Sequence, residues 1–275
     1  MLSTREVTRP VAATRSATPA GRFWWDRARP NDVDQYPLRA VIFDLDALTD
    51  IECDGHRVVY NAAFAAHGLD FEWSVARYQK LLALGDERQR VTAELRARGI
   101  CTEADVLTQL LADEIYATKT MMFEEMIADA DLAPRPGLID LIMDAFAADV
   151  RVGVVTSGQR SWAEPLVRQL VGEGLIETIV TAEDVTRPVE AYQLALAELG
   201  MSPKNALAIT GSAAGLRAAN CAGLATVVVT DCAAAVDFPA AAVVRSDYGG
   251  AEPLLIANCQ RLHGHWWADH KPSAA

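Results

Sequence analysis

Asp44 and Asp46 are two carboxylates separated by one residue, and they follow the apolar run Leu38–Phe43 (LRAVIF). Two carboxylates that lose water close to each other raise the free energy of the folded chain, and a shared proton or cation offsets that cost. The pair therefore indicates acid–base or cation-assisted chemistry. A structural interpretation of the same residues stays open, in which both acids lie in a loop and one of them caps the next helix.

Three further apolar runs are also followed by polar residues. The first ends in Thr156-Ser157-Gly158, which offers a hydroxyl and flexible backbone N–H groups at a helix start, a suitable seat for an anion. The next is followed by Arg187, a fixed cation, and the last by the Gly/Ser loop Thr210–Gly215 (TGSAAG). Carboxylates, hydroxyls, a guanidinium and such a loop together suit a phosphoryl group.

The apolar runs predict the elements that position these side chains. Runs that are apolar on both faces are typical of strands buried between two helical layers, and helical periodicity fills the intervals. We therefore expect an α/β fold with a doubly wound parallel sheet, in which ligands bind at the carboxyl ends of the strands. The predicted strands lie at Leu38–Phe43, Val152–Val155, Thr178–Val180, Ala206–Ile209 and Ala225–Val229.

The interval between the first two runs is about a hundred residues long, and its pattern is helical throughout. One of its helices begins at Thr102 with Asp105 three residues on, an arrangement typical of a capping box. We expect a helical cap domain at 51–134, inserted into an α/β core formed by 37–50 and 135–250. Residues 1–36 are predicted to be a disordered or docked extension, and 251–275 a C-terminal helix and tail.

The composition excludes several classes of partner. The 275 residues include 25 Lys and Arg against 37 Asp and Glu, a formal net charge of −12, which argues against nucleic acid and anionic membranes. No apolar run approaches the roughly 18 residues of a membrane span. Five widely spaced cysteines without a C-x-x-C pair indicate a reducing, cytoplasmic location.

These motifs resemble the haloacid dehalogenase superfamily of phosphatases and phosphomutases. Asp44-x-Asp46 matches its aspartate motif, Thr156 its hydroxyl motif, Asp184–Tyr192 its basic segment and Ala206–Gly223 its closing motif. The resemblance runs from about Leu38 to Tyr248. Segments of the predicted cap are similar to the CbbY-type sugar-bisphosphate phosphatases, namely Gly55-His56-Arg57, Tyr60–Phe64, Gly68–Trp73 and Lys119-Thr120.

The resemblance implies covalent phosphoryl transfer on a small phosphorylated sugar. Asp44 would attack phosphorus, and Asp46 would protonate the leaving oxygen and then activate water. Thr156, Ser157 and Arg187 would hold phosphoryl oxygens. The cap would close over the substrate and select it.

The chain departs from the family pattern where the family binds Mg²⁺. The acidic residues that end the closing strand are replaced by Thr210 and Gly211. The implied metal ligands that remain are the Asp44 carboxylate, the Asp46 backbone carbonyl and Ser212, so we expect weak Mg²⁺ binding. A carboxylate at position 211 is expected to tighten it.

Two further departures concern loops. The Gly-Thr that follows the second aspartate in the family is Ala47-Leu48 here, and a cap loop that carries a substrate-facing cation becomes Leu84–Arg88 (LGDER), with Asp86 at the cation's place. The function expected is that of a phosphatase. The alternatives are a catalytically impaired relative that binds a phosphometabolite or a partner protein and regulates, and a metal-independent dehalogenase.

Overall fold

The computed structural model describes residues 36–84, 86–100, 105–128, 130, 132–231 and 238–270. The predicted N-terminal extension, the Thr102 capping box and the last five residues of the tail lie outside the described residues.

A six-stranded parallel sheet forms the centre of the described fold, with the strand order β3-β2-β1-β4-β5-β6. The predicted fold class is therefore confirmed, and each predicted run overlaps a strand. The sixth strand, β6, was not predicted because it is a half-buried edge strand of three residues. The strands are β1 (Ala40–Asp44), β2 (Arg151–Val155), β3 (Thr178–Val180), β4 (Ala206–Thr210), β5 (Ala225–Val229) and β6 (Val243–Arg245).

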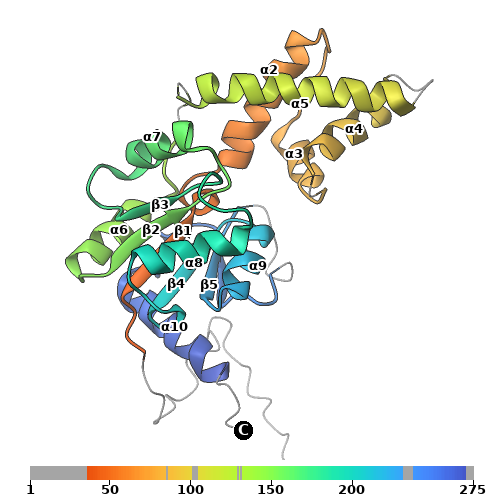
Figure 1. The fold of residues 1–275 in the computed structure, drawn as a ribbon. Coiled ribbons are helices and arrows are strands. Elements are labelled where there is room, and N and C mark those ends of the chain that lie inside the picture. Colours follow the sequence, from red (N-terminus) through yellow and green to blue (C-terminus); the bar gives the residue numbers. More distant parts are fainter. Residues whose placement is uncertain are drawn as a thin grey trace, which may run out of the picture. The chain divides into compact units, whose positions relative to one another are not determined.

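Helices cover both faces of this sheet (Figure 1). Helices α8 (Pro188–Glu198) and α9 (Ala213–Cys221) pack together on one face, while α6 (Leu138–Ala147) and α10 (Ile256–Asp269) pack together on the other. The central strands β4 and β5 are buried along their whole length, which explains their apolar sequences. The remaining elements around the sheet are α1 (Leu45–Leu48), α7 (Arg160–Val171) and the short 3₁₀ turn η3 (Pro203–Asn205).

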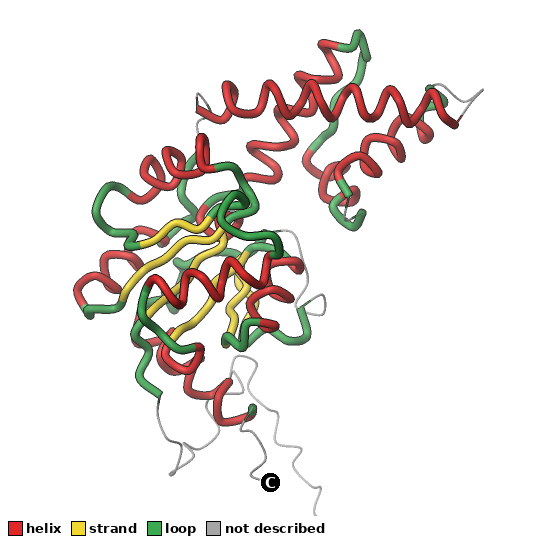
Figure 2. Tube along the Cα trace, in the orientation of Figure 1, coloured by secondary structure: helices red, strands yellow, loops and turns green. Residues whose placement is uncertain are grey.

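The segment between β1 and β2 is helical, and no strand lies among its described residues between Ile51 and Leu132 (Figure 2). We refer to residues 51–134 as the insertion. Its interior is aromatic, because Tyr60, Phe64, Trp73 and Tyr78 are fully buried against one another. Its helices are the π-helical turn η2 (Ile51–His56), α2 (Arg57–Ala66), α3 (Val75–Leu81), α4 (Glu87–Ala97) and α5 (Asp105–Ala128).

The two segments that connect the insertion to the sheet lie side by side. The Arg135 backbone N–H donates to the Leu48 carbonyl at 2.8 Å, and the Thr49 hydroxyl donates to the Ala133 carbonyl at 2.8 Å. The chain therefore leaves the core and re-enters it at one place, next to the loop that follows β1.

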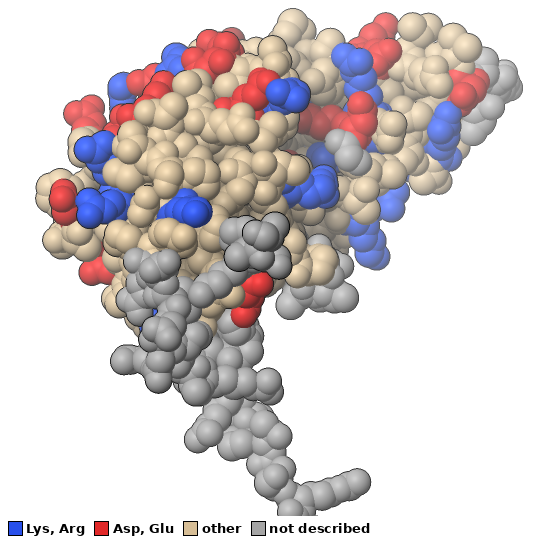
Figure 3. Space-filling view, turned by 60° about the horizontal axis from the view of Figure 1, so that its bottom comes forward, with Lys and Arg blue, Asp and Glu red and all other residues tan. Residues whose placement is uncertain are grey.

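The surface charge and the hydropathy of the helices can be compared with the expectation that nucleic acid and membranes are not partners. Basic and acidic side chains are interspersed on the face shown in Figure 3, and they do not gather there into one extended basic area. In the part of the chain that the structure describes, no helix combines the length and the apolar character that a membrane span requires. Cys53, Cys221 and Cys259 form no disulfide.

Candidate active site

The two predicted catalytic aspartates lie at the carboxyl end of the central strand β1. Asp44 is its last residue, and Asp46 lies in the one-turn helix α1 that follows. Because β1 pairs in parallel with β2 and β4, the ends of all three strands meet at one edge of the sheet. This edge brings Asp44 together with Thr156, which follows β2, and Thr210, which ends β4.

The Asp44 carboxylate is held from the β4 side. The Thr210 hydroxyl donates to Asp44 Oδ2 at 3.1 Å. Gly215, in the first turn of α9, packs so closely here that a Cβ would overlap both Thr210 Oγ1 and Asp44 Oδ2. Burial raises the pKa of Asp44 to about 6, although the hydrogen bonds from Thr210 and from the backbone N–H groups of Asp46 and Leu45 oppose the shift.

The pKa of the Asp46 carboxyl is raised as well. Burial and the neighbouring Asp44 raise it to about 7, and the opposing effects of a hydrogen bond with Ser212 and of the Arg135 charge are smaller. Both carboxyl groups of the pair thus have raised pKa values, because each loses water beside the other. A pair of this kind can hold one proton near neutral pH, which suits acid–base chemistry.

Arg135 is a site residue that sequence reasoning missed. Its Nε and Nη2 donate to the Asp46 backbone carbonyl, each at 3.3 Å, and its Nη1 lies 2.6 Å from Asp231 Oδ2. Only 7% of its side chain is exposed. The guanidinium thus places a permanent positive charge beside the second aspartate. The one available signal was an arginine between the two prolines that end the insertion, Pro134 and Pro136.

The residues of the hydroxyl motif form a tight turn after β2. Thr156 is buried, and its Oγ1 accepts a hydrogen bond from the Gly158 backbone N–H at 3.0 Å. Ser157 between them is exposed. The indole of Trp162 packs on Gly158 so tightly that a Cβ there would overlap the ring. The structure therefore places Thr156 and Ser157 where the sequence predicted them, with an unpredicted aromatic wall beside them.

Arg187, predicted to hold phosphoryl oxygens, points elsewhere in this structure. Its Nε and Nη2 lie 2.7 and 2.6 Å from Glu190 Oε1, and 71% of its side chain is exposed. Glu190 lies three residues on, in the first turn of α8, and also accepts from the Arg187 backbone N–H at 3.0 Å. A role in binding phosphate requires this side chain to leave Glu190 and turn toward β1.

The donor set expected for Mg²⁺ is present, and part of it is already engaged. The Asp46 carbonyl accepts from Arg135, and Ser212 Oγ accepts from the Gly215 N–H at 3.1 Å. No group of three or more His, Cys, Asp or Glu residues that could hold a metal occurs among the described residues. The Asp44 carboxylate is thus the one charged ligand of the predicted set, which fits weak rather than tight Mg²⁺ binding.

Two further residues bear on the predicted metal site. Gly211 does not have a positive φ; it lies so close to Asp46 that a Cβ would overlap the Asp46 carbonyl group. An aspartate at position 211 would press on a predicted ligand, which argues against the expectation that it completes the site. Asp184 braces its own loop, where its Oδ2 accepts from the Thr181 N–H and hydroxyl, both at 2.8 Å, and from Arg160 at 2.6 Å.

Comparisons with known proteins show which family the chain matches. Residues 38–223 match the haloacid dehalogenase-like hydrolases. The chain is 34% identical over 197 residues to protein CbbY of Cereibacter sphaeroides, covering 70% of this chain and 84% of that protein. It is 32% identical over 249 residues to the plasmid protein CbbY of Cupriavidus necator, covering 84% and 94%. A crystal structure of a CbbY mutant from Rhodobacter sphaeroides in complex with xylulose-(1,5)-bisphosphate has a TM-score of 0.58 at 30% identity, covering 78% of this chain and 97% of that one.

Proposed function

Because the chain belongs to the haloacid dehalogenase-like hydrolases, and within them to the CbbY-type phosphatases, we propose that it hydrolyses the phosphate ester of a small phosphorylated sugar. The observation that carries the proposal is the partly buried pair Asp44 and Asp46, with a hydroxyl donor on the first and a guanidinium beside the second. The substrate class follows the CbbY relatives, one of which is known in complex with a sugar bisphosphate.

The proposed first step is transfer of the phosphoryl group to Asp44. One carboxylate oxygen attacks phosphorus while the bond from phosphorus to the sugar oxygen breaks, and the Asp46 carboxyl gives its proton to that oxygen. The Thr210 hydroxyl fixes Asp44 Oδ2, which orients the carboxylate for attack by the other oxygen. The alcohol leaves neutral, and an aspartyl phosphate remains.

The second step returns the enzyme to its starting state. Asp46, now a carboxylate, takes a proton from a water molecule, which attacks phosphorus and releases Asp44 and inorganic phosphate. The Arg135 guanidinium stabilises Asp46 in this charged form, since it lowers the pKa of that carboxyl. Thr156 and Ser157 are proposed to hold phosphoryl oxygens through their hydroxyls, and Arg187 to join them when it leaves Glu190.

Hydrolases of this family typically use Mg²⁺, and we propose that this protein binds the ion weakly. The Asp44 carboxylate, the Asp46 carbonyl and Ser212 would hold it. When bound, it would offset negative charge between nucleophile and substrate. Titration calorimetry should give a dissociation constant in the millimolar range or weaker.

The test is a panel of sugar phosphates assayed for released phosphate, with and without Mg²⁺, on the natural protein and on Asp44→Asn. We expect turnover that Asp44→Asn abolishes, because the amide keeps the shape and removes the nucleophile. Asp184→Asn is the matched control, since Asp184 follows β3, two strands from β1, and its carboxylate bonds Thr181 and Arg160. Saturable binding of a phosphate ester without any turnover would instead identify a catalytically impaired, regulatory relative.

A further inference from the structure

Seven side chains of the insertion form a connected group of charges and rings that the proposed mechanism does not use. We call it the inner cluster. It consists of Glu52, His56, Tyr60, Tyr78, Glu87, Arg90 and Lys119.

Each cation of the inner cluster is matched by a carboxylate. Lys119 Nζ lies 2.9 Å from Glu87 Oε2, which also accepts from the Tyr60 hydroxyl at 2.7 Å. Arg90 Nη1 lies 3.7 Å from Glu52 Oε2, which accepts a hydrogen bond from the Tyr78 hydroxyl at 2.7 Å. The Arg90 and Lys119 side chains are 9% and 6% exposed. Burial and then Asp46 raise the pKa of Glu52 to about 7, so the two cations and two carboxyl groups leave the cluster with only a small net charge near neutral pH.

The inner cluster is connected to the proposed phosphate seat through two aromatic rings. The His56 ring stacks on Phe123 at 4.4 Å between centroids, and Phe123 meets Trp162 edge-on at 5.0 Å. Trp162 in turn packs on Gly158, whose N–H donates to Thr156. Burial and then the charge of Asp46 raise the pKa of Glu52. The cluster therefore lies next to the aromatic side of the phosphate seat and within electrostatic reach of the proposed acid.

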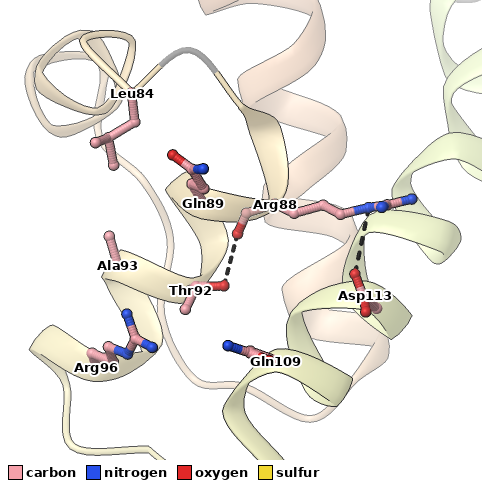
Figure 4. A pocket seen from close by; sticks show the side chains of 8 residues that line it. All are labelled: Leu84, Arg88, Gln89, Thr92, Ala93, Arg96, Gln109 and Asp113. Atoms are coloured by element: carbon pink, nitrogen blue, oxygen red, sulfur yellow. Dashed lines mark hydrogen bonds and ion pairs between the residues drawn. The ribbon is translucent and has the colours of Figure 1, made fainter. Parts of the chain in front are cut away.

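The start of α4 supplies no further cation to the inner cluster. Asp86 is the N-cap of α4, where its Oδ1 accepts from the Gln89 N–H at 3.0 Å. Arg88 points away into a pocket of about 520 Å³ between α4 and α5, where it pairs with Asp113 at 3.4 Å (Figure 4). Within the described part of the turn formed by residues 84–88, Glu87 is the residue that joins the inner cluster.

Binding of a phosphate group against the inner cluster would be unfavourable. Phosphate carries nearly two negative charges near pH 7, and it binds well where unpaired guanidinium or ammonium groups receive it. Here Lys119 and Arg90 already hold carboxylates, and a phosphate would have to displace them or lie against them. Burial and the nearby Lys119 also lower the pKa of His56 to about 3, so that its imidazole brings no charge. The carboxyl groups and tyrosine hydroxyls instead suit hydrogen bonds to the hydroxyl groups of an uncharged sugar, and the aromatic rings suit contact with its C–H groups.

We propose that the inner cluster determines specificity, and that the substrate is a sugar monophosphate whose remaining part is uncharged. This inference rests on the proposed function for the site at Asp44. In this proposal Glu52 and Glu87 exclude a second phosphate, because they neutralise the cations Arg90 and Lys119 that would otherwise bind it.

The experiment compares a monophosphate and a bisphosphate of the same sugar, fructose 6-phosphate and fructose 1,6-bisphosphate. For the natural protein we expect kcat/KM to favour the monophosphate by roughly tenfold or more, since like charges placed together cost over 1 kcal/mol. Glu87→Gln, which frees Lys119, and Glu52→Gln, which frees Arg90, should each move the ratio toward the bisphosphate by roughly tenfold. Asp113→Asn, which frees Arg88 in the outer pocket, should leave the ratio unchanged.

The ratio of the binding constants for the two sugars is also measured by calorimetry in the Asp44→Asn background. The inference can then be judged even if no ester turns over. Preference of the natural protein for the bisphosphate would overturn it. A shift in Asp113→Asn as large as that in Glu87→Gln would also overturn it, because the effect would then be one of total charge. The two glutamine variants lie on different helices, and melting curves identify whichever of them folds as the natural protein does.

Discussion

Two partly buried carboxyl groups, Asp46 beside the sheet and Glu87 in the insertion, have opposite pKa shifts. Burial and Asp44 raise the pKa of Asp46 to about 7. Burial acts on Glu87 in the same direction, but Lys119, His56 and the Tyr60 hydroxyl together outweigh it, and the pKa falls to about 2. Arg135 bonds the Asp46 backbone carbonyl, whereas Lys119 bonds the Glu87 carboxylate itself. Asp46, with a second carboxylate beside it, can thus exchange a proton near neutral pH, whereas Glu87, with an ammonium on its carboxylate, remains a fixed charge.

The largest expected effect is on turnover, and it tests whether Asp46 exchanges a proton while Glu87 is a fixed charge. Asp46→Asn should reduce turnover of a sugar phosphate by roughly 10²- to 10⁴-fold, because general acid–base catalysis is lost. The loss should be smaller for p-nitrophenyl phosphate, whose leaving group needs no proton. Glu87→Gln should show no such dependence on the leaving group. Equal losses of Asp46→Asn on both esters would contradict the assignment of Asp46 as the acid.

The second effect concerns the close contact of β4 with the Asp46 carbonyl. Gly211→Asp should lower the free energy of unfolding by about 1–3 kcal/mol through overpacking, without tightening Mg²⁺ binding. Chemical denaturation and calorimetry measure the two quantities. Gly211→Ala is the control, since it introduces the Cβ without the charge. A tighter Mg²⁺ complex in Gly211→Asp would show that the backbone yields and that a carboxylate can complete the site.

The smallest effect is a pH dependence of stability in the insertion. His56 has a folded-state pKa of about 3, against about 6.5 for an unfolded chain, because burial and then Lys119 oppose its charge, as Arg90 does, whereas Glu87 favours it. Since the unfolded state binds the extra proton, stability is complete above about pH 6.5 and decreases as the pH falls from there toward 3. His56→Phe should therefore lose less melting temperature between pH 7.5 and 5 than the natural protein. Identical losses would show that His56 is not neutral in the fold.

The sheet could be predicted because its central strands are buried on both faces, so that each of them is an unbroken apolar run in the sequence. Asp44, Asp46 and Thr156 could be located for the same reason, since each follows such a run. The edge strand Val243–Arg245 left no comparable pattern because it is short and half-buried.

The contacts that distinguish this site could not be predicted. Arg135 bonds a backbone carbonyl 89 residues away and a carboxylate 96 residues away. Every residue has a backbone carbonyl, so the residue types do not indicate which one accepts the bond. Arg187 stands in the expected place, but Glu190 lies one turn on and decides where the guanidinium points. The inner cluster combines residues from five helical elements, so its charges come together only when those elements pack.

The hydrogen bonds between the two connecting segments have an evolutionary consequence. Because Leu48 and Arg135 meet at 2.8 Å, a short turn that joins Thr49 to Ala133 would close the same gap that the whole insertion now bridges. Exchange of the helical part would therefore reroute no strand of the sheet. If the insertion selects the substrate, as we propose, substrate selection and chemistry are encoded in separate stretches of the gene.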